Sequence, residues 1–112
     1  MLSKEMMGAS NIPLILSILL EQEDYGYEII KKVKAHSEGK VDWSEPMLYP
    51  LLHRLEKNGH ISSRWVILKN GRKRKYYSIT TAGRELLRER KEEWLQMIGV
   101  FSRVWNINLQ GL

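Results

Sequence analysis

Residues 69–75 carry the side chains most suited to binding chemistry, because five of these seven residues are cationic and none is acidic. The whole chain has a net charge of +5, which equals the charge of this one segment, so the rest of the chain is neutral overall. Concentrated cations suit a polyanion, because displacing condensed counterions from phosphates favours binding. A solvated turn that only aids solubility is the alternative, but the absence of any acid in the run favours phosphate contact and a nucleic-acid partner.

Composition narrows the class of protein. A chain of 112 residues, 43% hydrophobic and 28% charged, is typical of one globular domain. Cysteine is absent, which excludes disulfides and thiol catalysis and fits a reducing interior. The three histidines lack the spacing of metal ligands, and the sequence has no catalytic triad or phosphate-loop motif. We therefore expect no metal, no cofactor and no enzymatic activity.

The apolar run at residues 12–20 is too short to cross a membrane, and the first residues lack the layout of a signal peptide. We therefore expect a cytoplasmic protein without a membrane partner.

Four helices and two strands are predicted. The first helix covers residues 12–22, capped by Ser10 or Asn11, and whether residues 3–10 extend it across Pro13 is left open. The second covers residues 27–36, and residues 41–43 form either a short strand or an extended entry. The third runs over residues 44–57 with Ser44 as its cap, and Pro50 implies a local distortion or a later start.

Two strand patterns follow, over residues 61–68 and 75–80, and the pair Asn70-Gly71 between them predicts a hairpin turn. Thr80 or Thr81 then caps a long final helix that reaches Trp105. This order is that of a winged helix-turn-helix, mainly α with a two-stranded β wing (α+β). We expect residues 1–80 to form the DNA-binding domain and residues 81–112 a dimerisation helix.

In this architecture the third helix enters the major groove, and the wing contacts either the flanking backbone or the minor groove. The expected contacts lie at the start of the third helix, on its outward side, or on the wing. They are Ser44, Glu45, Met47, Tyr49, Pro50, His53, Arg54, Lys57, Arg72, Lys73, Arg74 and Lys75. Tyr49 has a half-buried alternative and His53 a plain surface alternative, whereas Tyr27 is expected in the core and Trp43 and Trp65 in structural positions.

The final helix carries a heptad-like apolar stripe, which would be an unusual exposed patch if it stayed in water. Its residues are Leu87, Trp94, Ile98, Phe101 and Trp105. A second copy related by a two-fold axis would cover it, with help from Leu16 and Leu20 of the first helix. The alternative is that this helix folds back on its own domain.

Several segments resemble the PadR family of bacterial transcriptional regulators. They are Tyr25-Gly26-Tyr27-Glu28-Ile29, the run from Met47 to Glu56 with Gly59-His60-Ile61 after it, Arg72-Lys73-Arg74-Lys75-Tyr76-Tyr77, and Ile79-Thr80-Thr81-Ala82-Gly83. Together they span about residues 10–90. The chain departs from the family pattern at His60, where the family usually has an aliphatic residue, and at Pro13, which interrupts a helix that is often continuous.

The resemblance implies a cytoplasmic homodimer that binds a palindromic double-stranded DNA operator, usually as a repressor that an inducer releases. The short single helix after the wing resembles the smaller subfamily, in which some regulators hold planar aromatic drugs between tryptophans at the dimer centre. It thereby suggests Trp94 and Ile98 as contacts for a small aromatic inducer, although Trp94 could equally fill the dimer seam.

Three other functions are compatible with such a chain: an RNA-binding winged helix, a protein-interaction module and a small-molecule carrier. The sequence predicts no exposed aromatic platform on the sheet, which argues against RNA, and the cationic wing argues against a protein module.

Overall fold

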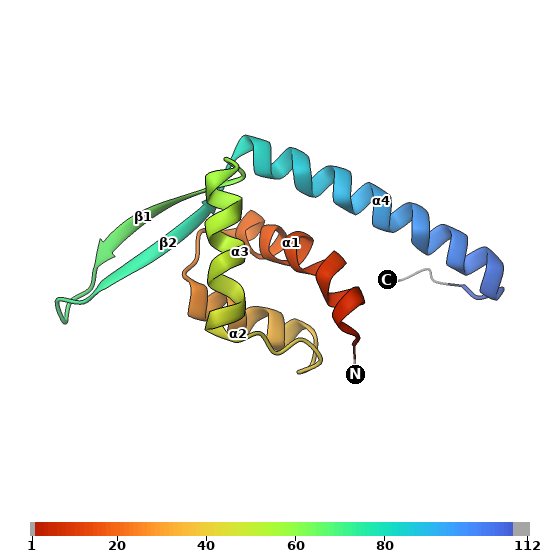
Figure 1. Cartoon of the computed structure of the whole chain (residues 1–112), viewed down its shortest axis with the longest axis horizontal. Helices are drawn as coiled ribbons and strands as arrows, with labels where there is room; N and C mark the ends of the chain where they lie inside the picture. The colour runs from red at the N-terminus through yellow and green to blue at the C-terminus, as the bar shows by residue number, and fades with distance from the viewer. Residues whose placement is uncertain (1, 109–112) are drawn as a thin grey trace.

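The computed structural model describes residues 2–108, and the fold class is the predicted one, a winged helix (Figure 1). Its elements are α1 (Lys4–Glu21), α2 (Gly26–His36), α3 (Glu45–Lys57), β1 (Ile61–Ile67), β2 (Lys73–Ile79) and α4 (Thr81–Trp105). The first three helices form a body, from which the β1–β2 hairpin and α4 extend in different directions (Figure 1). The molecule is accordingly elongated, with extents of 56 × 29 × 24 Å.

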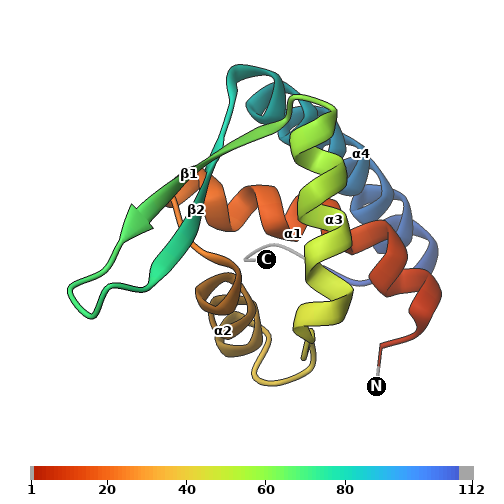
Figure 2. The same cartoon turned by 60° about the vertical axis from the view of Figure 1, so that its left-hand side comes forward.

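The core lies around α1, which crosses behind α3 and contacts α2, β2 and α4 (Figure 2). Apolar residues at helical spacing meet there, because each helix turns one face inward. Buried members from the three helices of the body are Ile15, Leu16, Ile18, Leu19, Ile29, Val33, Leu48, Leu52 and Leu55. Val41 and Trp43 are buried beside them, and residues 41–43 form no strand.

The first helix is longer than its minimum prediction of residues 12–22. α1 begins at Lys4, where the Ser3 side chain accepts a hydrogen bond of 3.1 Å from the Met6 backbone N–H. Pro13 lies inside the helix, so the cap predicted at Ser10 or Asn11 is wrong. A proline removes only one backbone donor, and here Met7, before Pro13, packs against the core and holds the earlier turns in place.

The third helix begins where Ser44 predicts it. The Ser44 hydroxyl accepts from the Met47 N–H at 3.3 Å, and the helix continues through Pro50 to Lys57 without the later start that Pro50 suggested. Gly59, at φ +80°, then reverses the chain, and the His60 N–H donates to the Leu55 carbonyl at 2.9 Å. This is a Schellman ending, and it directs the chain straight into β1.

The hairpin pairs β1 and β2 antiparallel, with Ile61 opposite Ile79 and Ile67 opposite Lys73. The free edge of β2 is also occupied near the body. The backbones of Asp24 and Tyr77 exchange two hydrogen bonds of 3.0 and 2.7 Å, which anchor the hairpin to the loop before α2. The buried Asp24 carboxylate also pairs with Lys32. Nothing in the local sequence pattern predicted this anchor.

The last helix packs most closely on the body in its first turns, and farther along Trp94 is half-buried beside α1. Thr80 is the cap, and its hydroxyl accepts from the Gly83 N–H at 3.1 Å. A Cβ on Gly83 would lie 2.0 Å from the His60 carbonyl oxygen, so only glycine permits this close approach. Leu87 is buried in the common core, and beyond it α4 leaves the body (Figure 1).

Candidate nucleic-acid interface

The outer face of α3 is open to solvent, as the helical period of its buried leucines requires. Seven of the predicted contacts are exposed there: Ser44, Glu45, Tyr49, Pro50, His53, Arg54 and Lys57. Met47 differs, because its side chain is half-buried and packs against the core. Met47 therefore contributes to the packing of the body, and its contact with DNA stays a prediction.

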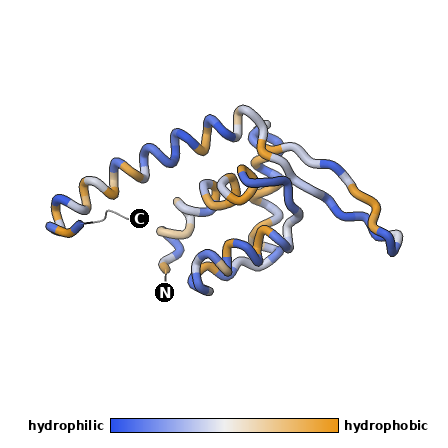
Figure 3. Tube along the Cα trace, turned by 180° about the vertical axis from the view of Figure 1, so that it is seen from behind, coloured by the Kyte–Doolittle hydropathy of each residue, from blue (hydrophilic) through white to orange (hydrophobic). Residues whose placement is uncertain are grey.

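The turn of the wing holds its cations away from the body. Leu68 and Arg72 close the turn with a 2.7 Å hydrogen bond, and the Gly71 N–H donates to the Leu68 carbonyl at 2.9 Å. Gly71 has φ +83°, a left-handed conformation that favours glycine, and the Asn70 side chain accepts from the Arg72 N–H at 3.0 Å. The Asn-Gly turn prediction is confirmed, and the tip is hydrophilic in Figure 3.

The register of the hairpin separates the wing cations onto two faces, because neighbouring residues of a strand point in opposite directions. Lys73 and Lys75 pair across the ladder with Ile67 and Trp65. Arg74 points to the other face, where its guanidinium lies 3.9 Å from the centre of the Tyr25 ring.

One of these cations is not free. Lys75 Nζ lies 3.4 Å from the Glu56 carboxylate on α3, and Ser63 donates a hydrogen bond to the same carboxylate. The Ser63 hydrogen bond, and more weakly the Lys75 charge, hold the pKa of Glu56 below its ordinary value. The inference that the wing lacks a compensating acid is thus corrected. Among residues 2–108, Lys69, Arg72 and Lys73 have no acidic partner within 4 Å.

A groove of about 660 Å³ separates the wing from α2 and α3, and we call it the wing groove. Its lining brings together aromatic and cationic side chains from two helices and both strands of the wing. They include Tyr25 and Tyr27 at the start of α2, Tyr49 of α3, Trp65 of β1, and Arg72, Lys73, Arg74 and Lys75. α3 and the wing, which were predicted separately from the sequence, therefore line one concave surface.

Tyr49 is held in this groove by the backbone of α2. A Cβ on Gly26 would lie 3.0 Å from the Tyr49 hydroxyl and 3.1 Å from the ring carbon that carries it. Burial, and to a smaller extent the charge of Glu45, raise the pKa of Tyr49, so its hydroxyl keeps its proton at neutral pH and can donate a hydrogen bond. An outward donor of this kind is suited to a phosphate oxygen or a base edge.

Two aromatic residues lie where the sequence did not predict them. Tyr27, expected in the core, is 54% exposed, and Trp65, expected in a structural position, is 63% exposed. Both line the wing groove. The expectation that Trp65 has a structural position is therefore wrong, because this side chain stands beyond the point where the hairpin leaves the body.

The second candidate surface is the apolar stripe of α4. Trp94, Ile98 and Phe101 are half-buried and Trp105 is 58% exposed, with the rings of Phe101 and Trp105 stacked at 4.6 Å between their centroids. The exposed apolar residues beside them are Leu95, Met97, Val100 and Val104. This surface belongs to the half of α4 that projects from the body (Figure 1).

Two predicted members of the dimer surface lie elsewhere. Leu16 is fully buried and Leu87 is nearly so, both in the core of a single copy. They offer no surface to a second copy in this structure, because α1 and the first turns of α4 use them to pack against each other and the body. Leu20, by contrast, is 44% exposed on α1.

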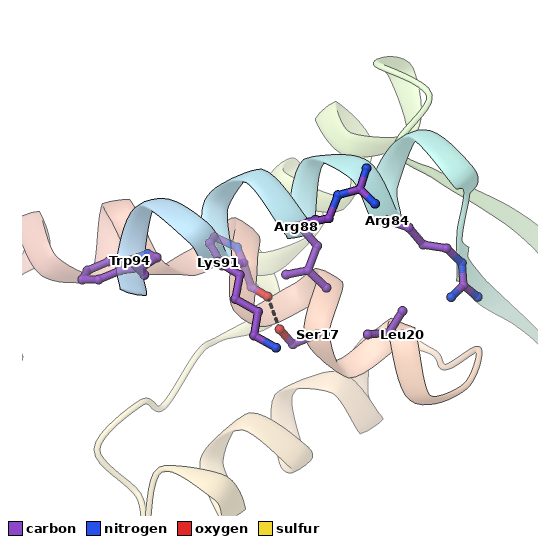
Figure 4. Close-up of a pocket in the computed structure, with 8 residues that line it drawn as sticks. Ser17, Leu20, Arg84, Arg88, Lys91 and Trp94 are labelled. Carbon is purple, nitrogen blue, oxygen red and sulfur yellow. Dashed lines mark hydrogen bonds between the residues drawn. The ribbon is translucent and has the colours of Figure 1, made fainter. Parts of the chain in front are cut away.

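Trp94 also lines a groove of about 560 Å³ between α1 and α4 (Figure 4). Ser17 and Leu20 contribute from α1, and the cations Arg84, Arg88 and Lys91 extend along α4. Ile98, the other suggested ligand contact, does not line this groove. The groove therefore combines one aromatic wall with several basic side chains.

Within residues 2–108 no helix is long and apolar enough to span a bilayer, and no three His, Asp or Glu side chains lie close enough together to hold a metal ion.

Comparison with known proteins agrees with this geometry. A protein of Lysinibacillus sphaericus that is described as uncharacterized is 36% identical over 84 residues, which cover 75% of this chain and 77% of that protein. A transcriptional regulator from Clostridium thermocellum has a similar structure, with a TM-score of 0.81, 32% identity, and coverage of 89% of this chain and 97% of that one. A PadR-like transcriptional regulator from Bacillus cereus gives a TM-score of 0.78 at 35% identity, over 97% of this chain and all (100%) of that one.

The model of the transcriptional regulator PadR-like family matches residues 15–89, which include α2, α3, the wing and the start of α4. This match covers more than half of the chain and runs through the wing groove. The chain therefore belongs to the PadR-like family of transcriptional regulators, which are DNA-binding proteins rather than enzymes.

Proposed function

We propose that this DNA-binding regulator acts as a homodimeric, ligand-responsive repressor of a palindromic operator in the cytoplasm. The observation that carries the DNA-binding part is the wing groove, where Arg72 and Lys73 lie beside Tyr49 of α3 and have no acidic partner among the described residues. Lys73 lines this groove together with Tyr49, so one DNA backbone could be contacted from both elements.

In this proposal α3 reads bases in the major groove. Ser44, Glu45 and Tyr49 lie near the start of α3, and its exposed side chains farther along meet phosphates: His53, Arg54 and Lys57. On the wing, Arg72 and Lys73 supply phosphate contacts, whereas Lys75 and Arg74 also serve to orient the hairpin through Glu56 and Tyr25. Pro50, exposed beside Tyr49, supplies an apolar contact to sugar or a thymine methyl.

The homodimer rests on the apolar stripe of α4. Trp94, Ile98, Phe101 and Trp105, together with Leu20 of α1, would pack against the same residues of a second copy about a two-fold axis. In this proposed domain organisation, residues 1–80 bind DNA and residues 81–112 hold the two copies together. The symmetry then requires an inverted repeat whose half-sites lie about one helical turn, ~34 Å, apart.

The inducer would bind beside Trp94. A planar aromatic molecule could stack on this indole at the seam between the copies, and would change the spacing of the two α3 helices. The half-buried Trp94 in an open groove supports this step, and Ile98 lies on the same helix one turn further on.

The deciding experiment is selection of bound fragments from genomic DNA by the purified protein, followed by nuclease footprinting and light scattering of the complex. We expect an inverted repeat protected by two copies. A protected site without symmetry, or one copy per site, contradicts the dimer proposal. Structured RNA that competes better than duplex DNA would contradict the operator proposal itself.

A further inference from the structure

Two large apolar side chains stand in solvent on the outer part of the wing. Trp65 is 63% exposed and Ile67 is 72% exposed. Both belong to β1 and are two residues apart, so they lie on the same face of the hairpin. Ile61, further back on this face, is buried in the core. The apolar face of the strand thus continues beyond the body that covers its beginning.

Exposed apolar side chains on an outer strand favour aggregation unless a binding partner covers them. The sheet has two strands, so β1 presents a free edge along its outer side. An exposed apolar edge strand favours unwanted pairing with other chains, and proteins usually protect such edges with charges. Here the charges come from across the ladder, because Lys75 lies opposite Trp65 and Lys73 lies opposite Ile67. The result is an apolar pair flanked by two lysines.

The chemistry of this surface matches the minor groove of a DNA duplex. The groove is about 6 Å wide, which admits side chains but not a helix, and its walls are apolar sugars bordered by phosphates. Proteins that bind there combine Arg or Lys contacts with apolar side chains, which many of them insert between base steps. Trp65 also lines the wing groove together with Tyr49 of α3. The apolar pair is therefore continuous with the surface assigned to DNA.

We propose that Trp65 and Ile67 form the contact of the wing with the minor groove beside the operator half-site, with Lys73 on the bordering phosphate. This inference rests on the proposed DNA-binding mode, which it extends by an apolar contact that the cationic wing alone does not supply. Pairing of β1 with β1 of a second copy, or with another protein, is the competing explanation of the same exposed edge.

The test compares Trp65→Ala and Ile67→Ala with Val66→Ala, a matched control because Val66 lies between them on the opposite face. The probes are two labelled duplexes that carry the selected operator with flanks rich in either A·T or G·C pairs, and affinity is followed by fluorescence anisotropy over a salt series. We expect Trp65→Ala to weaken binding about tenfold, on the scale of partial apolar burial. Ile67→Ala should weaken it less, and Val66→Ala should have little effect.

The salt dependence separates an apolar contact from a charge contact. Trp65→Ala should leave the slope of log affinity against log salt unchanged, because no phosphate contact is lost. It should also reduce the difference between the two flanks, since groove width and apolar fit depend on sequence. The melting temperature should stay within about 2 °C, because the side chain is exposed in the free protein.

Two further measurements distinguish a lost DNA contact from misfolding of Trp65→Ala. Trp65→Phe keeps an aromatic ring and should restore most of the affinity lost in Trp65→Ala. Addition of duplex should quench tryptophan emission in the unaltered protein, and Trp65→Phe should remove most of this quenching.

Unchanged DNA affinity of Trp65→Ala would overturn the inference while leaving operator binding intact. A change in the number of associated copies, without a change in affinity per dimer, would overturn it in favour of edge pairing. A parallel fall in the salt slope would assign Trp65 to orienting the lysines only. If the unaltered protein binds no duplex, both the proposed function and this inference fail.

Discussion

The wing and the outer half of α4 leave the same body in different directions, and they expose different chemistry. The wing carries cations whose positions are fixed within one chain, by the Asp24–Tyr77 backbone bonds and by the Lys75–Glu56 pair. The outer half of α4 carries apolar side chains that no part of residues 2–108 covers, such as Val104 at 73% exposure.

This difference distinguishes a surface that is ready for its partner from one that is incomplete. A phosphate backbone needs cations at suitable positions, and one folded copy can supply them. An apolar helix face gains stability only when it is removed from water, and α4 has too few neighbours of its own beyond Leu87 to do this. We therefore expect substitutions on the wing to change DNA affinity, and substitutions on α4 to change the state of assembly.

The largest effect is expected from a charge in the α4 stripe. Ile98→Asp would place a carboxylate in the proposed seam, where an unpaired buried charge costs several kcal/mol. We expect dimers to dissociate into monomers with at least about a 100-fold rise in the dimer Kd, measured by light scattering after gel filtration. Gln96→Asp, on an exposed position of the same helix, is the control and should leave the mass unchanged. A dimeric Ile98→Asp would remove the stripe from the interface.

The next effect distinguishes two lysines of the wing. Lys73 has no acidic partner among the described residues, whereas Lys75 lies 3.4 Å from Glu56. Lys73→Ala should weaken binding to all duplexes and lower the salt slope by about 0.9, the value for one lost phosphate contact. Lys75→Ala should change the slope less, because its charge is already partly neutralised. Equal changes for both lysines would show that the pair with Glu56 opens on DNA.

A smaller effect is expected from Gly26, which leaves room for Tyr49. Gly26→Ala would press a methyl group against the Tyr49 ring and hydroxyl, and we expect about a fivefold loss of operator affinity. Stability should change little, because Tyr49 is 44% exposed and can move away from the added methyl group.

Two comparisons sharpen this test of Gly26. In a Tyr49→Ala background the Gly26 substitution should have no effect on affinity, which a double-mutant cycle would measure. Gly8→Ala is the matched control, since nothing lies within 4 Å of the added methyl. Additive losses in the cycle would mean that Gly26 acts independently of Tyr49.

The smallest effect concerns the pH dependence of the contacts that Glu56 of α3 makes with Lys75 and Ser63 of the wing. The pKa of Glu56 is lower in the folded protein than its ordinary value of 4.5, chiefly because Ser63 donates a hydrogen bond to it. The contribution of the Glu56 carboxylate to stability is therefore present above pH 4.5, and it is lost as the pH falls through the lowered pKa. Because the group is partly exposed, we expect less than about 1 kcal/mol.

Urea unfolding of the unaltered protein and of Glu56→Gln, at neutral pH and in acid, measures this contribution. The difference between the two proteins should shrink in acid. If the difference in the free energy of unfolding stayed constant, Glu56 would stabilise the contact between α3 and the wing without its charge.

Local signals were sufficient wherever a few neighbouring residues decide the conformation. Ser44 and Thr80 predicted the starts of α3 and α4, and Asn70-Gly71 predicted the turn of the wing, because caps and turns depend on side chains that bond to their own backbone. The outward face of α3 followed from the spacing of its leucines. The sequence did not decide the start of α1, because packing, rather than Pro13, determines where that helix begins.

Pairings over long stretches of chain could not be predicted in the same way. Lys75 meets Glu56 and Asp24 meets Tyr77 only after the wing has been folded back beside α2 and α3. The exposure of Tyr27 and Trp65 and the burial of Leu16 have the same origin, because an apolar pattern states which side chains favour burial but not which part of the body covers them.

The amino-acid sequence by itself determined the elements, their order and a basic wing, since these depend on short-range propensities and on total charge. Only the tertiary structure decided which cations pair with an acidic side chain, which aromatic residues face solvent, and where α4 leaves the core. Those properties depend on distances between residues far apart in the chain, and such distances exist only once the chain has folded.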